Sequence, residues 1–109
     1  MTTRMTRHAA LAAVDATDDR VYGILLQHGS LEIGFYKPRG ADPQEPHEQD
    51  EVYIVQSGHG QFVIGDERHA FEPGEALFVP AGVVHRFEEF SDDFAAWVIF
   101  YGPTGGEEP

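Results

Sequence analysis

From Val21 onward, apolar residues occur in short runs that either alternate with polar residues or are apolar throughout. Runs of this kind, separated by turn residues, are typical of β-strands. We recognise seven of them, at residues 21–27, 31–36, 51–55, 61–65, 68–71, 76–80 and 95–101. Short strands at this spacing predict an all-β fold, either a sandwich or a barrel.

The segments between the runs are rich in residues that favour turns. They are His28–Ser30, Pro38–Pro46, Ser57–Gly60, Gly65–Glu67 and Glu72–Gly74. The runs at 51–55 and 77–79 are apolar on both faces, as expected for strands that lie between a second sheet and a filled barrel interior. No internal repeat and no long linker divides the chain.

The two ends of the chain differ from this pattern. Residues 6–14 contain alanine and leucine, which favour one or two helical turns, and the polar cluster at 15–20 ends them. We therefore expect a loose N-terminal lead-in segment at residues 1–20, helical or irregular, and a barrel at residues 21–102. The residues 103–109 are expected to form a mobile acidic tail.

Composition narrows the range of partners. With 109 residues the chain has the size of one domain. Nineteen acidic residues against seven basic ones give a net charge of -12, which repels nucleic acid and anionic membrane surfaces. No apolar run approaches the roughly 18 residues of a membrane span, and residues 9–14 are too short for a secretory signal, so we expect a cytoplasmic location. Without cysteine, any metal must be held by nitrogen and oxygen ligands.

One segment carries a specific motif. Gly74, Pro80, Gly82 and His85 follow one another with five, one and two residues between them. This order resembles the second motif of the cupin superfamily at each of these positions. Where the family often has asparagine, four residues after the histidine, this chain has Glu89.

A second segment resembles the family's first motif in part. Counting back from Gly58, Glu51 takes the glutamate position and His47 the second histidine position. The first histidine position holds Glu45, and Gly40 lies one residue closer than the motif asks. Together the two motifs cover residues 40–89.

The resemblance to small single-domain cupins implies a double-stranded β-helix, which is a jelly-roll barrel. It also implies that His47, Glu51 and His85 bind one divalent transition-metal ion, which could be Fe, Mn, Ni, Zn, Cu or Co. Two histidines and one carboxylate suit such ions and leave coordination positions open. A fourth ligand could be Gln44, Glu45, Gln49 or water.

Geometry adds two conditions to this site. Four residues of straight strand span about 13 Å, so the chain must bend between His47 and Glu51 if both are to reach one ion. Tyr53 lies on the same strand face as Glu51, where its hydroxyl could point at a metal-bound ligand, although core packing is the commoner role.

The alternative to a metal site is that His47 and His85 are ordinary polar residues in surface turns. The other candidate histidines, expected at turns or on the surface, are His28, His59 and His69.

The sequence favours a metal-dependent enzyme, a dioxygenase or a related one, that acts on a small organic substrate. One alternative is a non-catalytic cupin that binds or senses a small molecule. Another is a sugar isomerase or epimerase that uses metal-free acid–base chemistry. Because small cupins commonly associate through their sheet edges, we also expect a homodimer.

Overall fold

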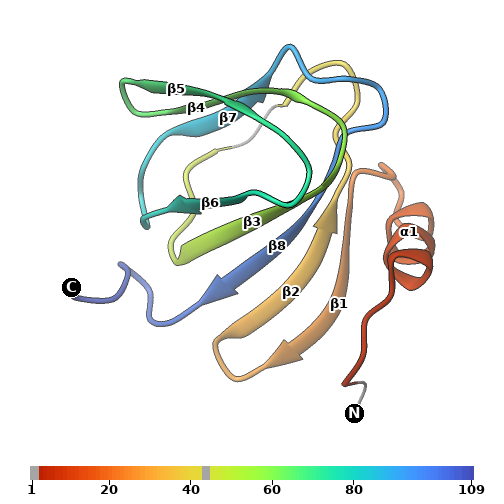
Figure 1. The fold of residues 1–109 in the computed structure, drawn as a ribbon. Helices are drawn as coiled ribbons and strands as arrows, with labels where there is room; N and C mark the ends of the chain where they lie inside the picture. Colours follow the sequence, from red (N-terminus) through yellow and green to blue (C-terminus); the bar gives the residue numbers. More distant parts are fainter. Residues whose placement is uncertain (1–2, 43–44) are drawn as a thin grey trace.

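The computed structural model describes residues 3–42 and 45–109, which form two antiparallel β-sheets and one short helix. The two sheets face each other as the walls of a barrel (Figure 1). In spatial order, the larger sheet contains β1 (Tyr22–His28), β2 (Leu31–Tyr36), β8 (Ala95–Tyr101), β3 (Asp50–Ser57) and β6 (Ala76–Val79). The smaller sheet contains β5 (Glu67–Phe71), β4 (Gly60–Ile64) and β7 (His85–Glu88). The expected all-β class is confirmed.

Strand β7 is the one strand that the seven apolar runs did not include. Its inward residues, His85 and Phe87, are buried, whereas Arg86 is exposed and Glu88 is half-buried. A strand of four residues with two charges has little apolar content, although its alternation is that of a half-buried strand. Pairing with the buried centre of β4 stabilises it, with Phe87 opposite Phe62.

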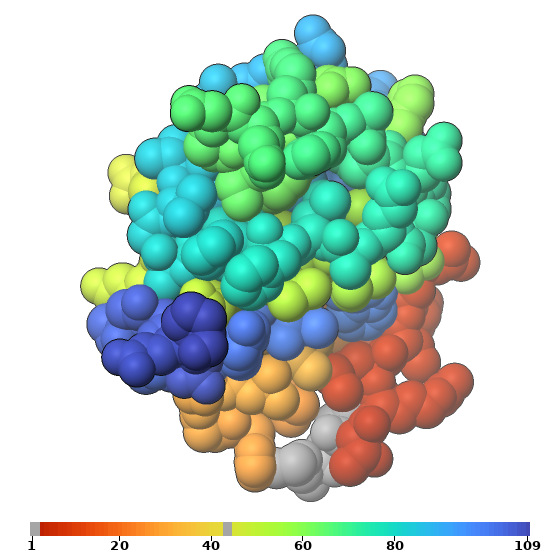
Figure 2. All heavy atoms as spheres, turned by 60° about the vertical axis from the view of Figure 1, so that its left-hand side comes forward, coloured from red at the N-terminus to blue at the C-terminus, as the bar shows by residue number. Residues whose placement is uncertain are grey.

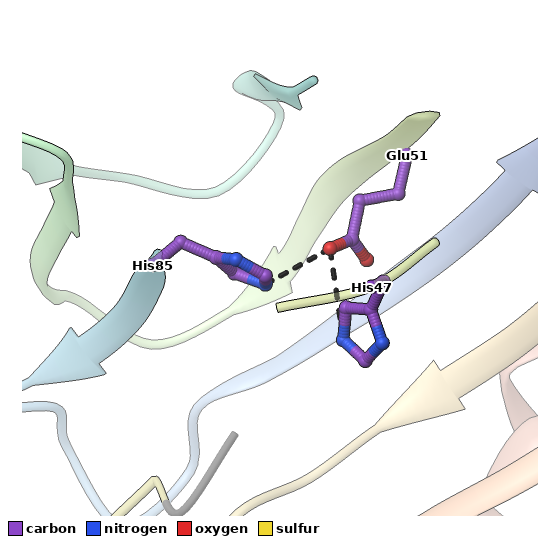
Figure 3. A group of neighbouring side chains, drawn as sticks. All are labelled: His47, Glu51 and His85. Carbon is purple, nitrogen blue, oxygen red and sulfur yellow. Dashed lines mark ion pairs between the residues drawn. The ribbon is translucent and has the colours of Figure 1, made fainter. Parts of the chain in front are cut away.

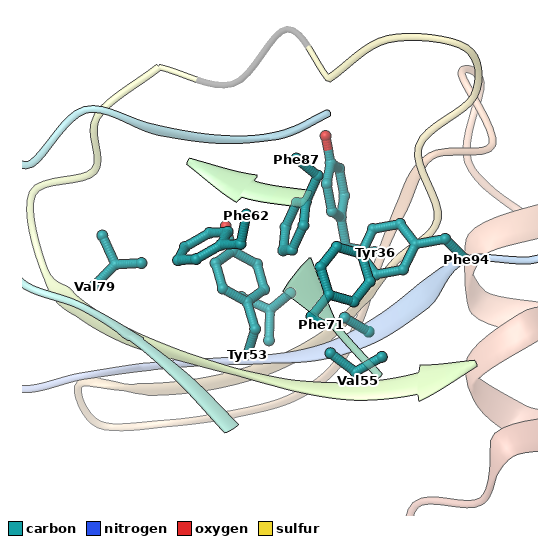
Figure 4. Close-up of a cluster of buried hydrophobic side chains, with 10 residues drawn as sticks. Tyr36, Tyr53, Val55, Phe62, Phe71, Val79, Phe87 and Phe94 are labelled. Atoms are coloured by element: carbon teal, nitrogen blue, oxygen red, sulfur yellow. The ribbon is translucent and has the colours of Figure 1, made fainter. Parts of the chain in front are cut away.

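Aromatic side chains fill the interior between the two sheets (Figure 4). Successive residues of a strand point to opposite faces, so the cluster takes alternate residues from β3 and β8 and one residue from β7. Its buried members are Tyr36, Tyr53, Val55, Phe62, Phe71, Val79, Phe87, Phe94, Ala96 and Val98. The rings contact one another mainly at tilted or edge-on angles, as aromatic pairs prefer.

Part of the N-terminal segment is a helix that packs against the barrel. Helix α1 (Arg7–Asp15) begins after Thr6, whose side chain accepts a hydrogen bond from the Ala9 amide at 3.1 Å. One face of the helix buries Ala10 and Val14 against the outer side of the larger sheet, where they join a second cluster with Phe35. This contact explains the helix better than propensity does, because nine residues are too few for an isolated helix.

The C-terminal residues lie against the barrel and are hydrogen-bonded to it. The Gly105 amide donates to the Glu48 carbonyl at 2.7 Å, and the Glu107 amide donates to Asp50 Oδ2 at 2.8 Å. Figure 2 shows this segment in dark blue on the surface next to the larger sheet. The segment expected to be a mobile tail is thus attached at least as far as Glu107. Within the described residues, no helix is long and apolar enough to cross a membrane.

Candidate metal centre

Three side chains from separate parts of the sequence meet at one end of the barrel interior (Figure 3). They are His47, from the segment before β3, Glu51, from the start of β3, and His85, from the start of β7. One ligand atom from each lies within 4.8 Å of the others. Glu51 Oε1 is 2.9 Å from His85 Nε2 and 3.7 Å from His47 Nε2. The structure therefore brings together the three residues that the sequence selected.

A bend at Glu48 and Gln49 brings His47 back towards Glu51, as the spacing required. The Gln49 side-chain amide donates to two backbone carbonyls, those of Ser30 and Gly102, each at 2.9 Å. The Gly82 amide donates to the His47 carbonyl at 2.8 Å and so joins the two motif segments directly. These bonds hold the bend in place.

Asp50 positions the turn that precedes His85. Its buried carboxylate accepts hydrogen bonds from the Ala81 amide at 2.9 Å, through Oδ1, and from the Glu107 amide at 2.8 Å, through Oδ2. Bonds from backbone amides to a carboxylate are stronger than neutral ones. Asp50 thus connects the start of β3 to both the second motif and the C-terminal segment.

The tautomer of His85 follows from its contacts. Nδ1 lies 2.9 Å from the Val83 carbonyl oxygen, which can only accept, so Nδ1 carries a proton. In the neutral ring, Nε2 therefore presents its lone pair towards Glu51 and the Tyr53 hydroxyl, which is 3.1 Å away. This is the arrangement in which a histidine binds a metal through one nitrogen and is oriented through the other.

The protonated form of His85 is also stabilised. Burial lowers the pKa of His85, but the contact with Glu51 and the hydrogen bond to the Val83 carbonyl together outweigh burial, and the pKa is raised. Without a metal ion, a proton on Nε2 would balance the charge of Glu51. Nε2 of His85 can thus bind either a proton or a metal ion.

Glu51 is the residue of this cluster whose surroundings fit a bound cation most clearly. Its side chain is fully buried, and neither carboxylate oxygen has a hydrogen-bond donor among the described residues. His85 Nε2 lies 2.9 Å from Glu51 Oε1, but in the neutral ring, with the proton on Nδ1, this nitrogen has no proton to donate. A buried carboxylate is costly unless a cation or several donors compensate its charge. The donor set and this unsatisfied carboxylate fit a divalent transition-metal ion.

The cluster borders a small cavity of about 210 Å³ inside the barrel. His47 lines this cavity and also an adjoining opening of about 430 Å³, and its ring packs edge-on against Phe100 with centroids 5.0 Å apart. The cavity is lined by Tyr22, Tyr36, His47, Tyr53, Val98 and Phe100. The opening is lined by Tyr22, Glu32, Pro46, His47, Glu48, Gln49 and Phe100. A molecule in the cavity would contact the side chain of His47.

The structure separates the remaining sequence candidates. Tyr53 faces the cluster as predicted and is buried in the core as well. Glu45 is exposed and outside the cluster, and the side-chain nitrogen of Gln49 is bound to backbone carbonyls. Gln44 lies outside the described residues. The surface positions expected of the other candidate histidines are confirmed for His28, His59 and His69.

Sequence reasoning missed two buried acidic residues next to the site. Asp50 has been described above, and Asp42 accepts hydrogen bonds from the Tyr36 hydroxyl and from the Phe87 amide, the latter at 2.8 Å. Both aspartates lie near turn residues in the sequence, where exposure is the usual outcome. Apart from Tyr36, their partners are distant in sequence, so no local signal identifies these aspartates as buried.

Comparisons with known proteins agree with this architecture. The family model described as the cupin domain matches residues 33–101. An uncharacterized protein of Streptomyces coelicolor is 37% identical over 95 residues, which cover 85% of this chain and 90% of the relative.

Solved structures extend the comparison at the level of the fold. A cupin 2 conserved barrel domain protein from Salinispora arenicola has a TM-score of 0.66 and 19% identity, covering 94% of this chain and 89% of its own. A Ralstonia eutropha protein provisionally named a mannose-6-phosphate isomerase has a TM-score of 0.61 and 22% identity, covering 76% and 84%. At these identities the likeness concerns the fold alone.

Proposed function

Because the chain belongs to the cupin family, we propose that His47, Glu51 and His85 bind one divalent transition-metal ion and that the protein is a metal-dependent enzyme. The proposed activity is that of a dioxygenase or a related oxidoreductase acting on a small organic substrate. The observation that carries the metal site is the buried carboxylate of Glu51, which has no hydrogen-bond donor among the described residues and lies beside two imidazole nitrogens.

The chain's own residues would perform three tasks at this site. The Val83 carbonyl fixes the ring of His85, so that Nε2 faces the cluster. The barrel buries Glu51 and thereby strengthens its interaction with a cation. The cavity beside His47 would hold the substrate next to the ion. When bound, a redox-active ion such as Fe(II) would supply the oxygen chemistry, and three protein ligands leave positions open for reactants.

Metal content tests the proposal directly. After incubation with Fe(II), Mn(II), Ni(II) or Zn(II) and desalting, we expect about one ion per chain for the best-bound metal. Glu51→Gln keeps the shape of the side chain but removes its charge, so metal affinity should fall by orders of magnitude. Glu67→Gln, at an exposed carboxylate on β5, is the matched control. Metal content at the level of the buffer would contradict the metal site.

The pH dependence of metal binding is a second readout. Because the pKa of His85 is raised and the metal displaces a proton from Nε2, metal affinity should decrease as the pH falls through that raised pKa. Metal uptake at a pH below that raised pKa should release protons into a weakly buffered solution. If proton release is equal in the parent protein and in His85→Gln, His85 is not a ligand.

Turnover distinguishes a metal-dependent enzyme from a cupin that binds a small molecule without catalysis. Oxygen uptake by the metal-loaded protein would be screened with small phenols, thiols and keto compounds. Uptake that requires both metal and Glu51 would support the enzyme. A loaded protein that binds these compounds without turnover would instead be a binding or sensory cupin.

One observation favours a second candidate, metal-free acid–base chemistry. His85 and Glu51 form a buried histidine–carboxylate pair at 2.9 Å, which is the kind of pair that proton transfer in a sugar isomerase needs. The name of the Ralstonia neighbour points in the same direction. Isomerase activity that survives exhaustive chelation would favour this candidate over the metal-dependent enzyme.

We also propose that the protein is a cytoplasmic homodimer with a barrel at residues 21–102. Strands β1 and β6 are the edges of the larger sheet, and edge strands are commonly covered by association. Light scattering should give twice the chain mass of 12.1 kDa at micromolar concentration. A mass of one chain over that range would contradict the dimer.

A further inference from the structure

Helix α1 covers one side of the outer face of the larger sheet. It packs on β1 and β2, whereas β3 and β6 form the other side of the sheet, away from the helix (Figure 1). Because Tyr53 and Val55 of β3 point into the barrel, Val52 and Ile54 point outwards. We call the outward residues of this other side the free face. They are Val52, Ile54, Ala76, Phe78 and Ile99.

The free face is apolar and uncharged. Ile99, Val52 and Phe78 lie opposite one another in a row across β8, β3 and β6. All three are partly exposed, and Phe78 retains 52% of its surface. In a chain of net charge -12, a row of exposed apolar side chains without a carboxylate is unusual. Contiguous exposed apolar surface of this kind marks a protein interaction site.

Helix α1 also has a second apolar side. Ala10 and Val14 are buried against the sheet, but Ala9, Leu11 and Ala12 are exposed, Leu11 by 38%. A helix that is polar on its outer side needs no further cover, whereas a helix that is apolar on all sides is normally buried. The chain thus exposes two apolar surfaces, the outer side of the helix and the free face.

The charges of the two surfaces are complementary. Residues 3–14 contain Arg4 and Arg7, and all nineteen acidic residues lie outside this segment. Neither arginine forms an ion pair with a described side chain. Acidic residues border the free face, with Glu75 directly before β6 and Glu107 bound through its amide to Asp50 of β3. A basic helix is attracted to such a border, which favours a second copy of this chain as the occupant.

The strand order permits both contacts at once. In the order β1-β2-β8-β3-β6, strand β8 is the middle strand. A two-fold axis that runs along β8, between two facing sheets, exchanges β1 with β6 and β2 with β3. The helix of each copy then lies over the free face of the other. An axis across the strands would place helix on helix, and two helices of about 10 Å diameter would hold the free faces apart.

From these surfaces we propose that two copies of the chain associate face to face, with helix α1 of each copy packed on the free face of the other. The inference rests on the homodimer proposed above and places its contact on the outer face of the larger sheet instead of at strand edges. It does not depend on the metal site.

Alanine substitutions test whether both surfaces are needed. Leu11→Ala and Phe78→Ala shorten exposed side chains, so the fold of the dilute, monomeric protein should be unaffected. Each should weaken dimerisation at least about tenfold, because each side chain occurs twice in the interface. Sedimentation equilibrium over a dilution series measures this. Val84→Ala, at a side chain that is 59% exposed and outside both surfaces, is the control. Equal dissociation constants in all three variants would overturn the inference.

Cross-linking tests which surfaces meet. Because the chain has no cysteine, single cysteines can be placed at Leu11 and at Phe78. The Leu11→Cys protein, carrying a tag that changes its mass, is mixed with the Phe78→Cys protein and treated with a short bismaleimide. We expect mixed dimers to be linked in preference to dimers of either variant alone. Preferential linkage of Leu11→Cys to itself would indicate helix on helix and would overturn the inference.

Mass and zinc content of the same samples separate this inference from the earlier proposals. A single-chain mass at every concentration would overturn both the homodimer and the face-to-face contact, and a zinc-loaded monomer would do so while leaving the metal site intact. A parent dimer that persists unchanged in Leu11→Ala and Phe78→Ala would overturn the face-to-face contact alone.

Discussion

The two ends of the barrel interior are built from the same strands but differ in chemistry. On β3, the inward residues Glu51, Tyr53 and Val55 run from a carboxylate to an apolar side chain. On β7, His85 is followed inward by Phe87. In both strands the first inward-pointing residue is polar, and the next inward-pointing residue is aromatic. The strands therefore place a polar end, around Glu51 and His85, against an aromatic end, around Phe87.

The two ends differ in the contacts that their buried side chains make. Phe87 has ring contacts on several sides, with centroids 4.7 Å from Phe94, 4.9 Å from Tyr53 and 5.0 Å from Phe62. Glu51 is equally buried, yet its oxygens lack donors among the described residues. One end thus contributes packing energy, whereas the other contains a charge that needs a cation. Substitutions at the two ends should affect different measurements.

The largest expected effect on stability comes from the aromatic end. Phe87→Ala removes a buried ring from the centre of the cluster, so the free energy of unfolding should fall by about 3 to 5 kcal/mol. Denaturant unfolding of the metal-free protein measures this. Phe78→Ala, at a side chain that is 52% exposed, should change stability by no more than about 0.5 kcal/mol. Equal losses in both variants would contradict the division between the two ends.

The three residues of the polar end were selected by the resemblance of two segments to the cupin motifs. His85 follows a proline and glycine turn, and His47 precedes a bend, and these local features are consistent with both histidines meeting Glu51. The sequence did not reveal that His85 is buried, because exposure depends on the opposing sheet. A histidine-to-alanine change would thus leave a cavity, and His85→Gln is the better test of its role as a ligand.

Long-range contacts account for what the sequence did not reveal. Asp50 and Asp42 are buried because backbone amides from distant segments donate to them. Helix α1 is packed because Gly23 of β1 leaves room for it, since a Cβ at that residue would lie 2.5 Å from the Ala13 carbonyl carbon. Neither feature has a local pattern of its own. Both depend on which segments the barrel brings side by side.

The two turns that flank β7 extend the comparison, since each contains a residue with positive φ. At the polar end Gly82 has φ +80°, and no atom lies within 4 Å of the Cβ that a side chain would add. Gly82→Ala should therefore lose about 1 to 2 kcal/mol through backbone strain alone. Thermal melts of the metal-free protein would show it. Gly82→Asn should lose less, because asparagine tolerates this conformation, and an equal loss would indicate a steric cause.

At the other end of β7, Glu89 adopts φ +52°, a conformation that is unfavourable for glutamate. The cupin motif often has asparagine at this position, and asparagine is among the residues that adopt positive φ most readily. Glu89→Asn should thus stabilise the protein by about 0.5 to 1 kcal/mol, the smallest of the three effects and opposite in sign. Because the substitution also removes one charge from a chain of net charge -12, Glu108→Asn serves as the control for charge. If the control gains as much stability as Glu89→Asn, relief of charge repulsion rather than of backbone strain is the cause.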